Sequence, residues 1–229
     1  MKFQNENIAI DGPAGSGKST IAKEIAFKIG ANYLDTGAMY RSVALYCLRN
    51  GIDVTNENMV KAHLDEINIA IEFEEGKQQV ILNGENVNSF IRTPELGQAS
   101  SKVSAIPDVR VKLVKVQQEF ASRQKVVMDG RDIATFVLPD AFLKIFLTAS
   151  AECRAMRRFL ELQSKGSEDT YEQVLAEMKE RDYRDTHREY APLTLVEDAV
   201  LIDTTEMTPK EVSERILSLY ENKLRESCN

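Results

Sequence analysis

One stretch decides the fold of this chain: Gly12-Pro13-Ala14-Gly15-Ser16-Gly17-Lys18-Ser19-Thr20. It matches the pattern G-x-x-x-x-G-K-[ST] at every fixed position, which is typical of loops that bind phosphate. Before it, residues 7–11 form an apolar run that predicts a buried strand, and after it residues 21–29 are apolar at helical spacing. Strand, glycine loop and helix follow one another in the order that the motif requires, which disfavours a chance match by an ordinary glycine-rich turn.

The chemistry of this stretch explains its composition. Glycines let successive backbone N–H groups curl around an anion, and the following helix points its positive end at the same place. Lys18 would reach the β and γ phosphates of a nucleotide, and the hydroxyl of Ser19 would ligate Mg²⁺. We therefore expect a nucleoside triphosphate to bind residues 12–20.

Length and charge limit the possible partners. With 229 residues the chain can form one large domain with a sizeable core. Its formal net charge is −7, from 29 Lys and Arg against 36 Asp and Glu, so phosphate binding must come from local groups. A nucleic-acid binder that works through a broad basic face is disfavoured.

Cysteine usage and hydropathy favour the cytoplasm. Cys47, Cys153 and Cys228 have neither metal-ligand nor redox spacing, and their odd number fits a reducing compartment. Residues 1–6 are polar, unlike a signal peptide, and no apolar run is long enough to cross a membrane. We expect a cytoplasmic protein with no membrane partner.

Strands and helices alternate along most of the chain. Short apolar runs predict about five strands, at residues 7–11, 31–35, 125–129, 142–147 and 199–203. This alternation indicates an α/β protein of three layers, a parallel sheet between helices, resembling the P-loop NTP hydrolases. Ligands of such sheets gather at the carboxyl ends of the strands, where Asp35, Thr36, Tyr40 and Arg41 would join the phosphate loop.

Residues 67–90 interrupt the parallel pattern. Apolar and polar residues alternate there, and turn signals stand at residues 74–77 and 83–86. This predicts a small antiparallel meander inserted between parallel units. From the residues alone the meander is an ornament on the fold, since nothing in its sequence assigns it a role.

Two helical segments carry arginines at helical spacing. The first carries Arg154, Arg157 and Arg158, and the second, after a break at residues 163–167 and a capping box at Thr170, carries Arg181, Arg184, Asp185 and Arg188. Arginine grips phosphate oxygens with a planar fork, so the two helices are suited to closing over a triphosphate. A solvated helix whose charges pair with one another is the alternative.

Arg131 and Asp132 directly follow a predicted strand, so both side chains should face the ligand rim. They would supply one phosphate contact and one acceptor for an amine or a hydroxyl, or else pair with each other. The only histidines, His63 and His187, lie in polar segments and are expected at the surface, so neither is assigned as a general base.

Two other classes of nucleotide-binding protein lack their signatures here. A regulatory GTPase needs Asn-Lys-x-Asp after a late strand, whereas residues 222–225 read Asn-Lys-Leu-Arg, and no Asp-x-x-Gly occurs. A motor ATPase favours a strand that ends in Asp-Glu, but Gly130 follows Asp129. A phosphotransferase with a small acceptor is favoured.

The chain resembles the bacterial cytidylate kinases along nearly its whole length. The matching segments are residues 10–20, Leu34-Asp35-Thr36-Gly37-Ala38-Met39-Tyr40-Arg41, Ile91-Arg92-Thr93-Pro94-Glu95, Asp129-Gly130-Arg131-Asp132-Ile133-Ala134-Thr135 and Glu180-Arg181-Asp182-Tyr183-Arg184-Asp185. The phosphate loop is shared by many families, whereas the second and fourth segments in this order are much more specific.

The resemblance implies an activity and a division of the chain. It implies that ATP phosphorylates CMP and dCMP to CDP and dCDP with Mg²⁺, by direct in-line transfer in a monomer. It implies one kinase domain with an adenylate-kinase-like core at residues 1–60 and 107–229. The meander becomes part of an acceptor-binding insert at about residues 61–106, and about residues 154–190 become a mobile lid.

The resemblance also implies roles for single residues. The residues that would surround CMP are Thr36, Tyr40, Arg41, Ser101, Arg110, Arg131, Asp132, Arg181, Asp185 and Arg188. Among them Ser101, Arg110 and Asp132 would read cytosine, Asp185 would face the sugar hydroxyls, and the other arginines would hold phosphate. Lys18, Arg131, Arg181 and Arg188 would be catalytic, and Arg157 would lie near the ATP base.

Some assignments stay open. Arg181, Arg184 and Arg188 are interchangeable on spacing, and some relatives have glycine at the position of Ser19, so its metal role rests on the general motif. A kinase of another small acceptor, such as a different nucleoside monophosphate or shikimate, and a non-catalytic nucleotide-binding regulator are the alternative functions.

Overall fold

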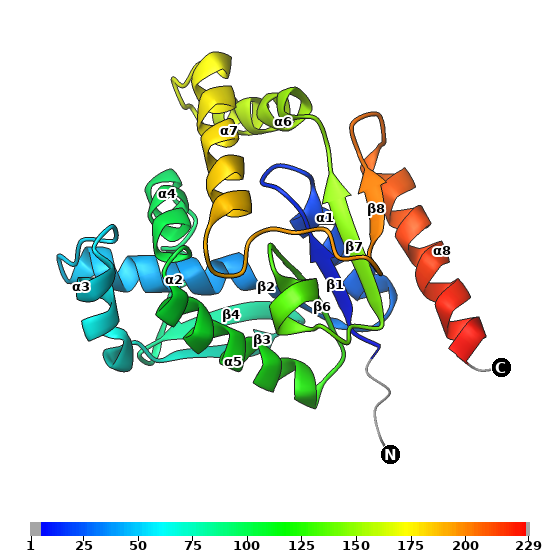
Figure 1. The fold of residues 1–229 in the computed structure, drawn as a ribbon, viewed down its shortest axis with the longest axis horizontal. Coiled ribbons are helices and arrows are strands. Elements are labelled where there is room, and N and C mark those ends of the chain that lie inside the picture. Colours follow the sequence, from blue (N-terminus) through cyan, green and yellow to red (C-terminus); the bar gives the residue numbers. More distant parts are fainter. Residues whose placement is uncertain (1–5, 228–229) are drawn as a thin grey trace.

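A five-stranded parallel sheet lies at the centre of the protein (Figure 1). The computed structural model describes residues 6–227, so Cys228 lies outside the described residues. The strands, in the spatial order β2-β6-β1-β7-β8, are β2 (Asn32–Asp35), β6 (Val126–Gly130), β1 (Ile8–Asp11), β7 (Leu143–Thr148) and β8 (Val200–Asp203). The predicted strands are confirmed, and β1 is buried throughout, as expected for a parallel strand covered on both faces.

Helices cover both faces of this sheet. On one face Ile8, Ile10 and Ile145 pack with apolar residues of α1 (Lys18–Lys28) and α8 (Pro209–Ser227). On the other face Ala9 and Met128 pack with α5 (Pro107–Arg123) and with η2, a π-helical turn at Ile133–Val137. The predicted three-layer arrangement is confirmed.

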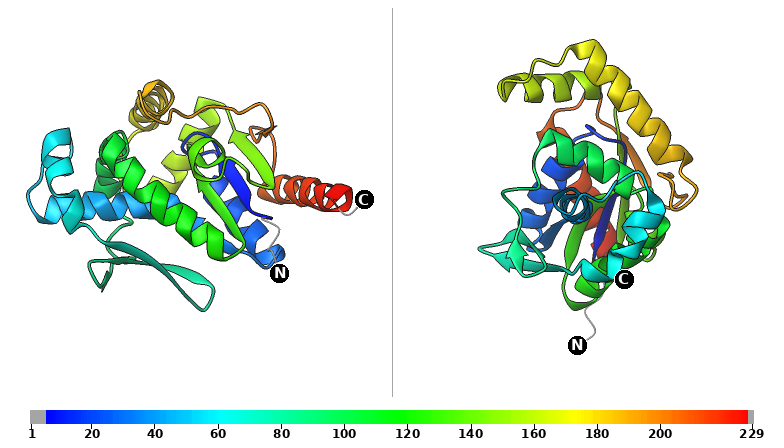
Figure 2. Two further views of the ribbon diagram at one scale, coloured as in Figure 1. Left: turned by 60° about the horizontal axis from the view of Figure 1, so that its bottom comes forward. Right: turned by 90° about the vertical axis from the view of Figure 1, so that its left-hand side faces the viewer.

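The predicted meander is a separate antiparallel sheet. It consists of β3 (Ile69–Glu74), β4 (Lys77–Leu82) and β5 (Glu85–Asn86). Its two turns have positive φ at Glu75, Gly76, Asn83 and Gly84, the conformation that tight hairpins require. Figure 2 shows the hairpin beside α5, where the Phe73 ring stacks on that of Phe120 with centroids 5.3 Å apart.

A second apolar core joins the small sheet to the helices around it. Val80 and Leu82 of β4 are buried in this core with residues of four helices and a 3₁₀ turn. These elements are α2 (Thr36–Arg49), α3 (Glu57–Ala62), η1 (Leu64–Glu66), α4 (Pro94–Val103) and α5. The meander is therefore packed firmly against the helices that carry the predicted acceptor residues.

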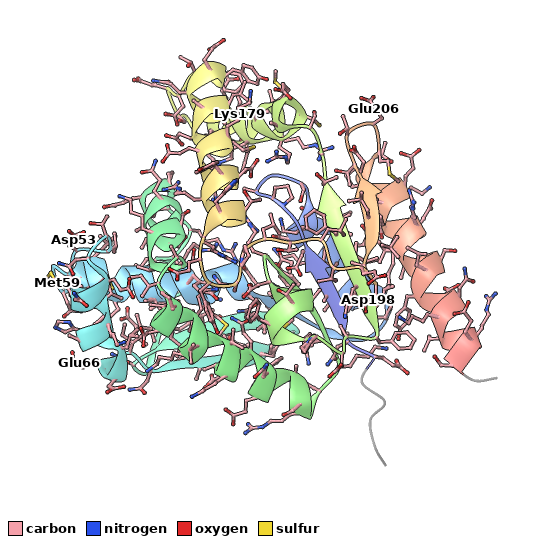
Figure 3. The ribbon with its side chains drawn as sticks, in the orientation of Figure 1. Asp53, Met59, Glu66, Lys179, Asp198 and Glu206 are labelled. Carbon is pink, nitrogen blue, oxygen red and sulfur yellow. The ribbon has the colours of Figure 1, made fainter. Side chains whose placement is uncertain are left out.

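Helices α6 (Ala151–Ser164) and α7 (Tyr171–His187) form a helical arm beyond the carboxyl ends of the central strands (Figure 1). A small apolar core that includes Ala155, Leu162 and Met178 joins them, and Lys179 of α7 pairs with Glu152 of α6 (Figure 3). The predicted capping box is present, because Thr170 and Gln173 exchange hydrogen bonds between side chain and backbone. Within residues 6–227, no helix combines the length and apolarity needed to span a bilayer.

Candidate active site

The phosphate loop joins β1 to α1 and has the backbone that its glycines allow. Gly12, Gly15 and Gly17 have φ of 145°, 74° and 90°. A Cβ on Gly12 would also collide with the carbonyl oxygen of Leu147 on the neighbouring strand. Both constraints require glycine at residue 12, so the motif is explained by close packing as well as by anion binding.

Lys18 is buried against this loop. Its ammonium donates to the carbonyl oxygen of Pro13 at 2.6 Å and to Ser16 Oγ at 3.3 Å, and the residue is 5% exposed. Burial and the neighbouring Arg131 guanidinium lower the pKa of Lys18 well below its usual value, and Asp129 and Asp11 oppose this. An anion in the loop would favour the charged form of Lys18 and so oppose this lowering of its pKa, which suits the site to phosphate.

Ser19 shares a buried carboxylate with Tyr33. Ser19 Oγ donates to Asp129 Oδ2 at 2.7 Å and Tyr33 Oη donates to Asp129 Oδ1 at 2.8 Å. Burial and the nearby Asp35 raise the pKa of Asp129, and Lys18 opposes this. A hydroxyl and a strand-end carboxylate are the protein groups that hold Mg²⁺ in phosphate-loop enzymes, so these residues fit that ion. Asp129 was not among the predicted site residues, because the glycine after it breaks the expected Asp-Glu signature.

Arg131 and Asp132 pair with other elements rather than with each other. Arg131 Nε donates to Asp185 Oδ2 of α7 at 2.7 Å, whereas Asp132 forms a salt bridge with Arg110 of α5. The side chains of Arg110 and Asp132 are only 2% and 5% exposed. Two carboxylates and two guanidinium groups from three elements are thus brought together. The alternative left open by the sequence, a mutual ion pair of Arg131 and Asp132, is not the arrangement found.

Arg181 and Arg188 complete a crowded cationic cluster. Burial lowers the pKa of each to about 10, helped by Arg131 in the first case and by Arg110 in the second. Although burial opposes it, Arg131 and Arg181 lower the pKa of Asp185. Arg184 instead pairs with Glu180 at 3.7 Å and is 43% exposed at its side chain, so Arg184 is not interchangeable with the other two.

Several polar atoms of this cluster are buried with no hydrogen-bond partner in the described residues. They include Nε of Arg41, Arg110 and Arg181, Nη2 of Arg188, Oγ of Ser101 and Oδ2 of Asp132. Leaving such groups unpaired costs about 1–3 kcal/mol each, and more when they are charged. The four guanidinium N–H groups are donors that the oxygens of an anion, such as a phosphate, could satisfy.

The start of α2 contributes a second group of predicted residues. Asp35 caps Ala38 N at 3.0 Å, and its Oδ2 accepts from Arg41 at 2.9 Å and from Arg92 at 3.1 Å. Thr36 Oγ1 donates to the carbonyl oxygen of Asp129 at 2.7 Å. The guanidinium carbon of Arg110 lies 5.2 Å from the centre of the Tyr40 ring, which joins this group to the cluster.

The meander reaches this group through Gln78 of β4. Gln78 Oε1 accepts from the backbone N–H of Asp35 at 2.7 Å, and Gln78 Nε2 donates to the Asp35 carbonyl oxygen at 3.3 Å. The sequence does not single out Gln78, because the contact depends on how the hairpin packs on the end of β2. The structure therefore ties the insert to the residue that holds Arg41.

The helical arm contacts the phosphate loop through α6. Arg154 Nη1 donates to the carbonyl oxygen of Ala14 at 3.1 Å and pairs with Asp182 of α7 at 2.7 Å. Arg157 donates to the hydroxyl and carbonyl oxygens of Thr204 at 3.1 and 2.7 Å, and Thr204 Oγ1 lies 3.4 Å from Ser16 O. Arg158 pairs with Glu161 on the surface. Two of the three predicted arginines of α6 thus lie beside the loop.

The histidines lie outside the cluster, as predicted. His187 is exposed and stacks on Tyr183, with ring centroids 4.0 Å apart. His63 ends α3, and its ring nitrogen lies 2.8 Å from the carbonyl oxygen of Met59. The site offers arginine, lysine and carboxylate groups, and no imidazole.

Comparison with known proteins agrees with this geometry. The family model described as cytidylate kinase matches residues 8–222. A cytidylate kinase of Caldicellulosiruptor saccharolyticus is 52% identical over 93% of this chain and 95% of its own length. One of Carboxydothermus hydrogenoformans is 47% identical over 94% and 97%. An uncharacterized protein of Eubacterium ventriosum shares the fold, with a TM-score of 0.53 and 12% identity over 93% of this chain and 97% of that chain. The chain belongs to the cytidylate kinase family.

Proposed function

We propose that this protein transfers the γ-phosphoryl group of ATP to CMP and dCMP, which yields ADP and CDP or dCDP. The observation that carries this proposal is the cluster of buried and half-buried arginines, whose buried guanidinium N–H groups lack partners in residues 6–227. Such a cluster matches two phosphorylated molecules held end to end. Membership of the cytidylate kinase family supports the same substrate pair.

The donor nucleotide would bind the phosphate loop. Backbone N–H groups of residues 12–20 and Lys18 would hold its phosphates, and Arg157 would lie near its base. Mg²⁺, when bound with ATP, would neutralise charge on the β and γ phosphates, and Ser19 and Asp129 would hold it. In the described part of the chain no group of three or more His, Cys, Asp or Glu residues is placed to hold a metal ion.

The acceptor would bind between α2, α4, α5 and α7. Asp132, aligned by Arg110, would accept from the exocyclic amine of cytosine, which uracil lacks, and Ser101 would add a hydroxyl. Asp185 would face the sugar hydroxyls, while Thr36, Tyr40 and Arg41 would line the phosphate side. The insert at residues 61–106 would serve as the acceptor lobe, and residues 154–190 as the lid.

Transfer would be direct and in line. The acceptor is already an ionised phosphate, so it needs no strong general base, which suits a site without histidine. Lys18, Arg131, Arg181 and Arg188 would stabilise the moving phosphoryl group, and the helical arm would exclude water. We expect the enzyme to act as a cytoplasmic monomer without nucleic-acid or membrane partners.

A coupled assay of ADP release tests this function. We expect rapid release with CMP and dCMP, slower release with UMP, and background rates with AMP, GMP and shikimate. Rapid ADP release with AMP or shikimate would show that this molecule, rather than CMP, is the phosphoryl acceptor. ATP binding without release for any acceptor would identify a non-catalytic regulator.

Gln78 gives a prediction about the insert. Gln78→Ala removes both hydrogen bonds to the Asp35 backbone, so Arg41 should be held less firmly. We expect the KM for CMP to rise by about threefold to tenfold, since two hydrogen bonds are each worth about 0.5–1.5 kcal/mol, with the KM for ATP unchanged. Gln79→Ala is the control, because Gln79 accepts from Asn86 and Asn88 within the insert. Equal effects of the two variants on KM would show that Gln78 has no particular role.

A further inference from the structure

The turn that follows Asp132 is capped by a residue of another strand. Asp132 occupies the N-cap position of η2, with φ −145° and ψ 24°, but its side chain makes no capping bond. The N–H groups of Ile133 and Ala134 donate instead to Asp11 Oδ1 at 2.9 Å and Asp11 Oδ2 at 2.7 Å. Aspartate is among the most favoured N-cap residues, so the Asp132 side chain would be expected to cap this turn, but it does not.

This exchange of roles leaves Asp132 available for Arg110. A carboxylate that caps its own turn folds back on the backbone and cannot point into a cavity at the same time. Because Asp11 already accepts from the N–H groups of Ile133 and Ala134, the Asp132 carboxylate is not needed to cap either of them. Asp132 therefore directs its carboxylate to Arg110.

Asp11 is placed rigidly enough to enforce this. It is 1% exposed, ends β1 and lies opposite Gly130 in the parallel pairing of β1 with β6. Burial raises the pKa of Asp11 to about 6, whereas the bonds from Ala134 and Ile133 lower it. Gly12, the first residue of the phosphate loop, directly follows Asp11 in the sequence. The Asp11 carboxylate therefore connects the start of this loop to the turn that follows Asp132.

We propose that Asp11 is a positioning residue for base selection, which acts by capping η2 so that the Asp132 carboxylate stays directed at the acceptor base. This inference rests on the proposed function, in which Asp132 distinguishes cytosine from uracil. Asp11 touches neither base nor phosphate in this role and acts through Asp132 alone.

The test compares Asp11→Asn with Asp198→Asn, measured with CMP and with UMP. An amide at residue 11 keeps one acceptor but turns its NH₂ group toward a backbone N–H, so Asp132 is drawn back to cap the turn. We expect the ratio of kcat/KM for CMP to that for UMP to fall roughly tenfold, which corresponds to the loss of one well-directed hydrogen bond in base selection. Asp198 pairs with Lys144 at 2.7 Å near the amino end of β8 (Figure 3), and the same chemical change there should leave the ratio within about twofold.

A double variant shows whether Asp11 acts through Asp132. In an Asp132→Asn background, Asp11→Asn should not change the CMP to UMP ratio further, because residues that act through one another are not additive. A further drop of similar size, or a raised KM for ATP with an intact ratio, would overturn the inference and leave Asp11 as a support of the phosphate loop.

Two further measurements test the proposal if Asp11→Asn does not fold. Asp11→Glu keeps both acceptor oxygens but places them one methylene further from the backbone. It should lower the ratio of kcat/KM for CMP to that for UMP less than Asp11→Asn does. In the unaltered protein, saturating CMP should shift the amide resonance of Ala134 more than saturating UMP, and equal shifts would contradict the proposal. If the unaltered protein does not phosphorylate CMP, the proposed function fails as well; an Asp11→Asn enzyme with normal base preference refutes this inference alone.

Discussion

Lys18→Ala is expected to lower the turnover number by on the order of a thousandfold, while the KM for CMP changes by less than about threefold. The Lys18 ammonium is fixed at the phosphate loop by Pro13 and Ser16, so it is already in place for charge that develops on the transferred group. Such a preorganised group stabilises the transition state more than the bound acceptor, which lies on the other side of the reacting phosphate.

Steady-state rates with saturating ATP and varied CMP measure this effect. Lys28→Ala is the control, because Lys28 lies at the end of the same helix and pairs with Glu24 on the surface at 2.6 Å. We expect its kinetics to match those of the unaltered protein. A Lys18→Ala enzyme whose turnover stays within about tenfold of normal would remove Lys18 from the chemical step.

Asp132→Ala is expected to reduce both stability and base preference. It leaves the Arg110 guanidinium buried without its carboxylate, and breaking a buried ion pair in this way costs about 3–5 kcal/mol in the free energy of unfolding. It also removes the acceptor for the cytosine amine, so UMP should become a nearly equal substrate. Denaturant unfolding measures the first effect, and the ratio of kcat/KM for CMP and UMP measures the second.

A second variant separates the two consequences. In Asp132→Leu with Arg110→Met, apolar side chains replace the whole ion pair, and such replacements are often neutral or stabilising. We expect the stability to recover while the base preference stays lost. If preference for CMP persisted in either variant, base recognition would have to be assigned to other residues.

The fold could be predicted from the sequence because its signals are local. The loop at residues 12–20, the turns of the meander and the cap at Thr170 each depend on residues close together in the chain. Helix α2 likewise begins with a local cap, because Asp35 accepts from the N–H of Ala38. The π-helical turn after Asp132 has no such local signal, because its cap comes from Asp11 on another strand.

The sequence named candidate site residues one by one but did not predict which of them pair. The family resemblance pointed to Arg110, Asp132 and Asp185, whereas their pairing depends on packing between α5, β6 and α7. Gln78 was missed for the same reason, since it contacts Asp35, 43 residues away in the chain. Asp129 was missed because Gly130 follows it, and its bond with Ser19 spans 110 residues. Arg181 and Arg184 lie one helical turn apart on α7, so the sequence does not separate their roles. The structure does, because Arg184 is exposed and Arg181 is half-buried.

Arg154 joins one carbonyl of the nucleotide-binding loop to the far helix of the arm, through Ala14 and Asp182. We expect this contact to couple occupancy of the loop to the position of the arm. By thermodynamic reciprocity, any factor by which ATP favours a closed arm is also the factor by which closure strengthens ATP binding. A crosslink that holds the arm closed should therefore lower the dissociation constant for ATP, as an equilibrium titration would measure.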